Sequence, residues 1–272
     1  MIRAVIFTAI SILGFSSAVL GQKGYEIGAW GGASMYYGDL NQSLNIKDPG
    51  FALGIQARRN FNTRASIKAS LGFSMIYGSD QGASNNFIRN RNLSFRTSII
   101  DLTTTAEINF FDLVYGSRNN KHTPYLLAGF SIFRFNPQAE LDGTWYNLQS
   151  LGTEGQPVGS EYSKFSGGWV LGGGYKWAIS PTTSINIELT TRFLFTDYLD
   201  DVSTVYPDKE ILENARGPEA VALSDRSLVD GLGAAGRQRG DTRSSDSYNF
   251  FSISINRYFG GLECPKISKP RY

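Results

Sequence analysis

The chain has 272 residues and a formal net charge of +2, and only 18% of its residues are charged. Nucleic-acid-binding domains usually carry a basic excess, so this near-neutral balance argues against that class. Aromatic residues make up 13% of the chain, which also has 30 glycines, and a single all-β barrel commonly reaches this length. These bounds favour one β-rich unit of low charge.

The first 21 residues have the parts of an export signal. Met1, Ile2 and Arg3 form a short positive region, residues 4–15 are apolar, and small residues follow up to Gly21. The apolar stretch is short for a spanning helix, so it predicts a signal peptide (1–21) cleaved after Gly21, with a membrane anchor as the alternative. No cysteine lies near that position and no later run of 18 apolar residues exists, so neither a lipid anchor there nor a helical span is expected.

Eight segments in the rest of the chain alternate apolar and polar residues with a period of two, which indicates β-strands. In residues 64–78, for example, Ile67 and Leu71 share one face and Lys68 lies on the other. Each segment is long enough for a tilted strand to cross a bilayer, which takes about 9–11 residues. The segments are 25–38, 50–61, 64–78, 94–111, 123–135, 165–179, 184–195 and 247–259, and alternation is weakest in 123–135.

Alternation alone fits a soluble β-sandwich as well as a transmembrane barrel. Two features of the segments favour the barrel: charges stand in mid-strand on the polar faces, and aromatic residues flank the apolar faces like an interfacial girdle. The flanking aromatic residues are Tyr25, Tyr37, Phe61, Tyr77, Phe165 and Trp177.

The lengths of the connections also favour the barrel. Bacterial barrels have long extracellular loops, short periplasmic turns and both termini in the periplasm. Long connections here (39–49, 79–93, 136–164 and 197–246) alternate with short or moderate ones (62–63, 112–122 and 180–183). The sequence therefore predicts an all-β fold, a single eight-stranded antiparallel outer-membrane β-barrel over residues 22–259, with a periplasmic tail over 260–272.

The polar faces of the predicted strands point into the barrel. An eight-stranded barrel is just wide enough for side chains to fill it, and buried charges must be paired. Four acids and four bases on these faces therefore predict a salt-bridged plug, with a selective ion path as the alternative. The inward charges are Glu26, Arg58, Lys68, Asp101, Glu107, Lys176, Glu188 and Arg192.

An acidic, aromatic stretch, TDYLDDVSTVYPD (196–208), opens the longest loop, 197–246. A loop of more than about 15 residues is usually functional or disordered. One interpretation is a solvated strand end with Tyr198 and Tyr206 at the membrane interface, and another is a packing element that folds the loop over the barrel mouth. A third is a calcium site, because hard cations take carboxylate oxygens; its candidates are Asp197, Asp200 and Asp201. No other metal or cofactor is predicted.

The stretch FTDYLDDVSTVYPD (195–208), the opening EIGAWGGASMYYGDLN (26–41), the eight-strand layout and the tail GGLECPKISKPRY (260–272) carry a resemblance. The chain resembles the PorG-like outer-membrane proteins of the type IX secretion system, a DUF6089-like family. The resemblance covers essentially the whole mature chain, and YLDDVS is its most specific part. It implies a non-enzymatic role: tethering or positioning, at the outer membrane, a periplasmic ring made of a lipoprotein and its partner. That machine exports proteins with a C-terminal signal domain and supports gliding in some bacteria.

The tail offers residues for a periplasmic partner. Cys264 is the only cysteine, so no internal disulfide can form, and in the oxidising periplasm it either bridges to the ring lipoprotein or stays a free thiol. Lys266, Lys269 and Arg271 form a basic strip beside it. This strip serves either the same partner or outer-membrane lipid headgroups.

Two other classes of function remain as alternatives. Some eight-stranded barrels modify lipids, which needs an acid–base constellation, but the only histidine, His122, falls in a predicted periplasmic connection. No enzyme is therefore predicted. A general structural or adhesin-like barrel would instead bind external ligands through its loops 136–164 and 197–246. The side of the membrane that binds a partner separates this alternative from the ring tether.

Overall fold

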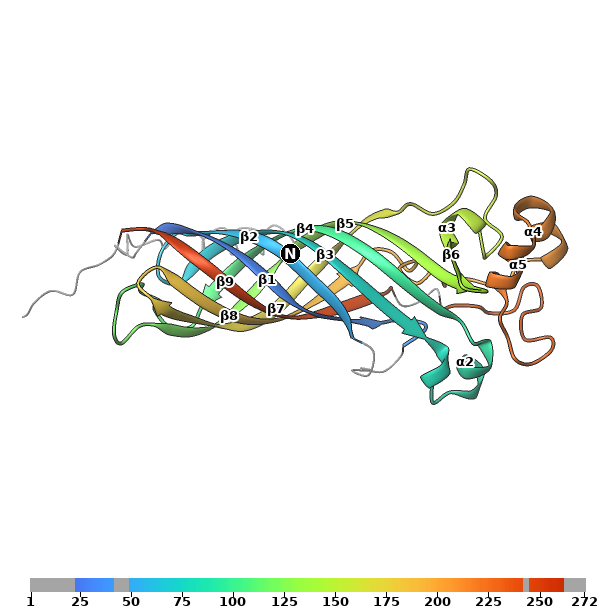
Figure 1. Cartoon of the computed structure of the whole chain (residues 1–272), viewed down its shortest axis with the longest axis horizontal. Helices are drawn as coiled ribbons and strands as arrows, with labels where there is room; N and C mark the ends of the chain where they lie inside the picture. The colour runs from blue at the N-terminus through green and yellow to red at the C-terminus, as the bar shows by residue number, and fades with distance from the viewer. Residues whose placement is uncertain (1–22, 42–48, 242–244, 262–272) are drawn as a thin grey trace, which may run out of the picture.

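The computed structural model describes residues 23–41, 49–241 and 245–261. The predicted signal peptide (1–21) and the tail residues Cys264, Lys266, Lys269 and Arg271 lie outside the described residues. The described chain is a barrel that carries helices and long connections at one end and short turns at the other (Figure 1).

Eight long antiparallel strands form the barrel wall. They are β1 (Gly24–Tyr37), β2 (Gly50–Asn60), β3 (Ala65–Ser79), β4 (Ser94–Asn109), β5 (His122–Leu141), β7 (Phe165–Ser180), β8 (Thr183–Leu194) and β9 (Ser247–Gly260). Consecutive wall strands pair with each other, and β9 pairs with β1 from Tyr25 opposite Phe259 to Tyr36 opposite Tyr248, which closes the barrel. The predicted fold class, an eight-stranded antiparallel barrel, is confirmed.

The outer face of the wall is an apolar belt. Outward side chains such as Ile55 and Ile108 are 61% and 65% exposed, and similar residues surround the whole circumference. So large an exposed apolar surface is unusual for a soluble monomer and is what a lipid-facing wall requires. All six girdle aromatics of the sequence pattern point outward and are exposed. Among the helices of the described segments, none is long and apolar enough to cross a membrane.

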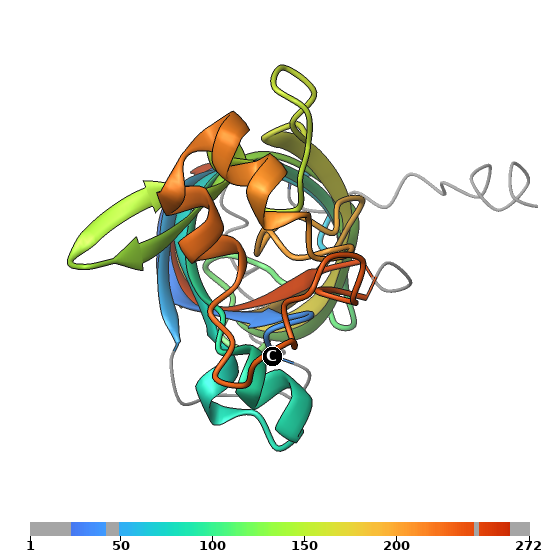
Figure 2. The same ribbon diagram turned by 90° about the vertical axis from the view of Figure 1, so that its right-hand side faces the viewer.

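Strand β5 is longer than the predicted segment 123–135. Its inward face carries apolar residues, including Tyr125, Leu127 and Phe135, all buried. Both faces are therefore apolar there, which weakens the alternation in the sequence. Past Arg134 its outward residues are polar, and a short strand β6 (Thr144–Asn147) pairs with its far end. The resulting hairpin projects beside the barrel (Figure 2).

The long connections gather over one mouth of the barrel, as Figures 1 and 2 show. The rule for bacterial barrels predicts that such an end faces the outside of the cell; we call residues 38–41, 80–93, 142–164 and 195–246, as far as they are described, the cap. It contains η1 (Asp80–Gly82), α2 (Asn86–Arg91), α3 (Leu148–Leu151), α4 (Lys209–Arg216) and α5 (Pro218–Ser224). These helices were not predicted, because the longest has only 8 residues, too few to establish a helical period.

The hydrophobic core lies where the extracellular part of the lumen meets the cap. Ile99 and Phe135 from the wall and Leu199 from the cap are fully buried in one cluster. Burial of apolar side chains is the main favourable term in folding. The cap is therefore held to the barrel by a shared core. Towards the short turns a smaller buried cluster contains Leu113, Tyr115, Ala178 and Tyr258.

Candidate functional site

The charge network in the lumen is centred on Glu107, on the inward face of β4. Its carboxylate oxygens lie 2.8 Å from Nε of Arg58, 2.6 Å from Nζ of Lys176 and 3.2 Å from Nζ of Lys68. The hydroxyl of Ser66 also donates to it, at 3.1 Å. One carboxylate thus faces three cations in a region that is closed to solvent.

The other predicted lumen charges complete this arrangement. Arg58 Nη1 lies 2.5 Å from Oε2 of Glu26, and Lys68 also pairs with Glu188. Farther towards the cap, Arg192 Nη2 lies 3.8 Å from Oδ2 of Asp101. The structure therefore places all eight of these side chains inside the barrel, and each has at least one opposite charge within 4 Å.

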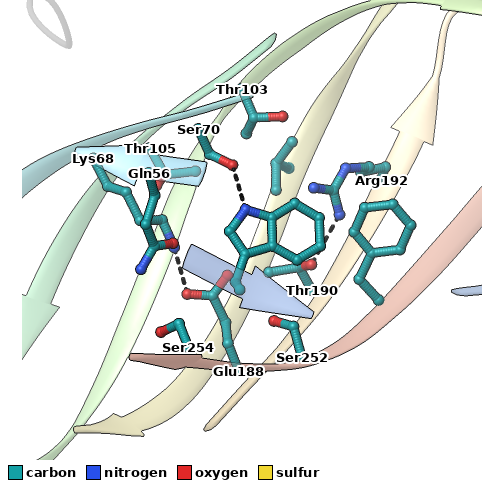
Figure 3. A pocket seen from close by; sticks show the side chains of 13 residues that line it. Gln56, Lys68, Ser70, Thr103, Thr105, Glu188, Thr190, Arg192, Ser252 and Ser254 are labelled. Carbon is teal, nitrogen blue, oxygen red and sulfur yellow. Dashed lines mark hydrogen bonds and ion pairs between the residues drawn. The ribbon is translucent and has the colours of Figure 1, made fainter. Parts of the chain in front are cut away.

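Between the Glu107 network and Arg192 lies a small polar cavity, shown with its lining side chains in Figure 3. The indole of Trp30 fills much of this level of the lumen and donates to the hydroxyl of Ser70 at 3.1 Å. The cavity measures about 20 Å³. A single water needs roughly 10–15 Å³, so this space is large enough for one or two waters.

The stretch YLDDVS (198–203) packs into the cap. The ring of Tyr198 stacks on Tyr162, with centroids 4.4 Å apart and planes inclined by 9°. Leu199 and Val202 are buried in the shared core. Of the three interpretations of this stretch, the packing element is the one that the structure shows; the interfacial position of Tyr206 is wrong, since that side chain is buried in the cap.

A tyrosine of the barrel wall links two carboxyl groups of the cap. The hydroxyl oxygen of Tyr36 lies 2.6 Å from Oδ2 of Asp200 and 2.8 Å from Oδ1 of Asp246. The amides of Val202 and Leu199 donate to the remaining oxygens of these carboxyls, each at 2.9 Å. Burial, together with the neighbouring Asp246, raises the pKa of Asp200 well above its usual range. Burial also raises the pKa of Asp246, so the pair favours retaining a proton.

Asp201 joins a second cluster built around Arg239. Its carboxylate accepts hydrogen bonds from the hydroxyls of Thr153 and Tyr162. Nη1 of Arg239 lies 3.1 Å from Oε1 of Glu154 and donates to the carbonyl of Asp201. Glu154 accepts in turn from the amides of residues 203 and 204, at 2.8 and 3.0 Å. Burial raises the pKa of Asp201 to about 6 although Arg239 opposes the shift.

Arg91, at the end of α2, ties the remaining connections together. Its guanidinium pairs with the carboxylate of Asp80 at 2.8 Å and donates to the backbone carbonyls of Asp39 and Arg239. Arg91 and Arg239 are buried, and buried charges are costly unless paired. The cap is therefore a cross-linked layer over the mouth, not a set of independent loops.

The calcium interpretation has no support in this geometry. Asp197 accepts from the hydroxyl of Ser203 at 2.7 Å, while Asp200 and Asp201 serve the separate clusters described above. Within the described parts of the chain, no group of three or more His, Cys, Asp or Glu side chains is arranged to hold a metal ion.

The opposite end, which is predicted to face the periplasm, carries a basic rim. Among the residues that the structure describes at this end, six bases are exposed and one acid, Asp112, is present; its carboxylate pairs with Arg64 at 2.8 Å. His122 is exposed at the start of β5, with Nδ1 2.7 Å from the hydroxyl of Tyr175. The bases of this rim are Lys23, Arg59, Arg64, Arg118, Lys121 and Arg257.

Sequence reasoning missed the polar residues that join the cap to the barrel: Tyr36, Arg91, Glu154, Arg239 and Asp246. The two partners of the Tyr36 hydroxyl lie 164 and 210 positions away in the chain. No local pattern signals such pairs. The one available clue was the unusual density of Asp and Tyr in 196–208.

A family model described as "Domain of unknown function (DUF6089)" matches residues 4–217. The chain belongs to the DUF6089 family. The match includes wall strands β1 to β8 and the YLDDVS stretch of this DUF6089 protein, and it ends before β9. A search of curated proteins found no match.

Several solved outer-membrane barrels are similar to the DUF6089 chain in architecture. Neisserial surface protein A is 12% identical with a TM-score of 0.44, over 88% of this chain and 99% of that one. OprG from Pseudomonas aeruginosa is 11% identical with a TM-score of 0.40, over 89% and 99%. Ail of Yersinia pestis, in complex with the heparin analogue sucrose octasulfate, is 9% identical with a TM-score of 0.39, over 88% and 99%.

Proposed function

We propose that this DUF6089 barrel is a non-enzymatic outer-membrane component of the type IX protein secretion machinery. It tethers or positions the periplasmic ring, made of a lipoprotein and its partner, at the outer membrane. In bacteria that glide, the same attachment serves gliding. The basic rim carries the proposal, because six exposed bases against one acid, counted over the described residues, form a surface suited to an acidic protein partner.

The filled lumen supports a function in binding partners at the surface of the barrel over a function in transport through its interior. The eight paired charges fill the lumen, and the cavity of about 20 Å³ among them is far too small for a protein. The cap packs over the other mouth through the core that it shares with the wall. A barrel of this kind acts through what it presents at its two ends.

The tail extends the proposed docking surface. Lys266, Lys269 and Arg271 would add to the positive charge of the rim, and Cys264 would form an intermolecular disulfide with the ring lipoprotein in the oxidising periplasm. Sequence and export context support this assignment; these residues lie outside the described part of the chain.

A gentle-detergent pull-down of the tagged protein from native membranes, run without reductant, tests the proposal. The wild type is expected to recover the ring lipoprotein, and Cys264→Ser to recover less of it. The double variant Arg118→Gln/Lys121→Gln is expected to weaken recovery, whereas Arg89→Gln/Arg237→Gln, with the same loss of charge on the cap, is the matched control. Recovery of the barrel without any ring component would refute the tether.

A second candidate is a structural or adhesin-like barrel that binds ligands through its extracellular face. The cap favours it in one respect, since it exposes large apolar side chains: Val158, Ile211 and Leu228 are 71%, 69% and 67% exposed. Such residues are typical of contact surfaces when they cluster. Binding of an external ligand that is lost on Ile211→Ser, with ring recovery unaffected or absent, would favour this candidate.

A further inference from the structure

A hollow lies on the outer wall of the barrel, near the extracellular limit of the apolar belt. It measures about 580 Å³ and is lined on the lipid side by Leu71, Ile100, Leu102, Ile132, Arg134 and Phe165. These residues come from four neighbouring strands, β3, β4, β5 and β7. The lining is mostly apolar: its polar members are Arg134, Ser166 and Asp101, and the Asp101 side chain is buried on the lumen side, where it pairs with Arg192. The guanidinium carbon of Arg134 lies 6.0 Å from the centre of the Phe165 ring.

The outward residues change character at this level. Ile100 stands opposite Arg134 in the β4–β5 pair, and the next outward pair along the strands is Ser98 opposite Asn136. From Arg134 towards the short turns the outer wall is apolar, and from Arg134 towards the cap it is polar. A lipid whose chain occupies the hollow would therefore place its headgroup over the Ser98–Asn136 pair.

Three cations surround that headgroup position. Lys164 Nζ lies 3.4 Å from Oδ1 of Asn136, so one ammonium is already there. Arg134 and Arg96 stand two residues to either side along the strands, roughly 7 Å away at about 3.4 Å per residue. Long arginine side chains span such distances.

These cations are not neutralised by the acids that the structure describes. Among the described residues none of the three forms an ion pair. Arg96 instead stacks on Trp145, with its guanidinium carbon 3.4 Å from the ring centre, and donates to Gln138 at 3.1 Å. The nearest outward acid on β5, Glu140, is two residues beyond Gln138. The surface is therefore positive and complementary to a phosphate.

We propose that this wall binds a phosphate-bearing lipid of the outer leaflet. One acyl chain lies in the hollow against Ile100, Ile132 and Phe165. The phosphate sits over Asn136, between the guanidinium of Arg134 and the ammonium of Lys164, and Arg96 supplies a third cation. This inference is independent of the secretion role, because it concerns the lipid-facing wall and not the periplasmic end.

Native mass spectrometry with added diphosphorylated lipid A tests the site on the full chain in detergent. Each cation close to an anionic lipid contributes roughly a factor of five in binding. Arg134→Gln/Lys164→Gln is therefore expected to weaken lipid A binding about 30-fold. Arg89→Gln/Arg237→Gln, with two exposed bases lost from the cap at the same end of the molecule, is expected to change it little. Unaltered gel mobility without heating shows that each variant barrel is folded.

Two results would overturn the site. The first is equal lipid A binding by the wild type and Arg134→Gln/Lys164→Gln, or an equal loss in the cap control. The second is displacement of the lipid by inorganic phosphate at comparable concentration, since the apolar hollow would then contribute nothing to binding.

Discussion

Replacing Glu107 with Gln should destabilise the barrel more than any exposed charge change. The substitution keeps the shape of the side chain and removes its charge. Arg58, Lys68 and Lys176 would then share only Glu26 and Glu188, because the remaining lumen acid, Asp101, pairs with Arg192 instead. Three cations against two acids leave one buried charge uncompensated.

The expected loss follows from the cost of breaking a buried pair. Removing one partner of a buried ion pair typically costs about 3–5 kcal/mol, because the other charge stays desolvated. Exposed pairs contribute about 0–1 kcal/mol. Asp112→Asn is the matched control, since the Arg64–Asp112 pair has an N···O distance of 2.8 Å while its side chains are 58% and 45% exposed.

Unfolding of the refolded barrel in lipid vesicles by a denaturant series measures both losses. Glu107→Gln should lose several kcal/mol and Asp112→Asn less than about 1 kcal/mol. A further change, Lys176→Met in the Glu107→Gln background, restores two acids against two bases and should recover part of the loss. Equal stability of Glu107→Gln and Asp112→Asn would refute the paired-plug account of the lumen.

Three further predictions concern the cap and the lumen. Burial raises the pKa of Asp197 to about 7 and of Asp201 to about 6 from 3.8, so the stability they give the folded cap is full below about pH 4 and is lost as the pH rises towards 7. Hydrogen exchange of the 197–206 amides, corrected for intrinsic rates, should therefore be slower at about pH 5 than at about pH 8. Asp197→Asn should reduce that difference between the two exchange rates. Exchange rates that do not depend on pH after this correction would contradict the prediction. Tyr36→Phe removes the hydroxyl between Asp200 and Asp246 and should lower the free energy of cap opening by about 1.5–3 kcal/mol in native-state proteolysis, whereas the outward Tyr37→Phe should not. In planar bilayers the wild type should pass no steady current, and a stable conductance would be inconsistent with the filled lumen.

The wall could be predicted from the sequence because lipid outside and a polar lumen inside impose a strict alternation. The predicted segment 184–195 is offset by one residue from β8 (Thr183–Leu194). Within each strand, odd and even positions face opposite sides of the wall, so the position of a charged residue determines whether it points inward. Glu107 and Asp101 are six residues apart on β4 and therefore share a face. The one weak segment, 123–135, ends too early, since β5 continues to Leu141. Up to Phe135 both faces are apolar, which weakens the alternation, and past Arg134 the outward residues are polar, so the apolar pattern stops before the strand does.

The cap could not be predicted, for a physical reason. Its helices are short, and its stability comes from buried polar groups that meet only after the barrel has closed. Arg91 donates to a carbonyl 148 positions away and Tyr36 to a carboxyl 210 positions away. Neither the hydrophobic periodicity of a segment nor a local sequence motif indicates such contacts. The role of YLDDVS in packing became visible only when its partners, Tyr162 and Tyr36, were placed beside it.

Photo-crosslinking in living cells tests the central claim most directly, because it reports which end of the barrel meets a partner. A crosslinking amino acid would replace Arg118, exposed at the periplasmic rim, or Asp230, exposed on the cap. The proposed tether predicts an adduct with the ring lipoprotein from position 118 and none from position 230. Adducts from position 230 alone, with none from any rim position, would contradict the tether and favour binding at the cell surface.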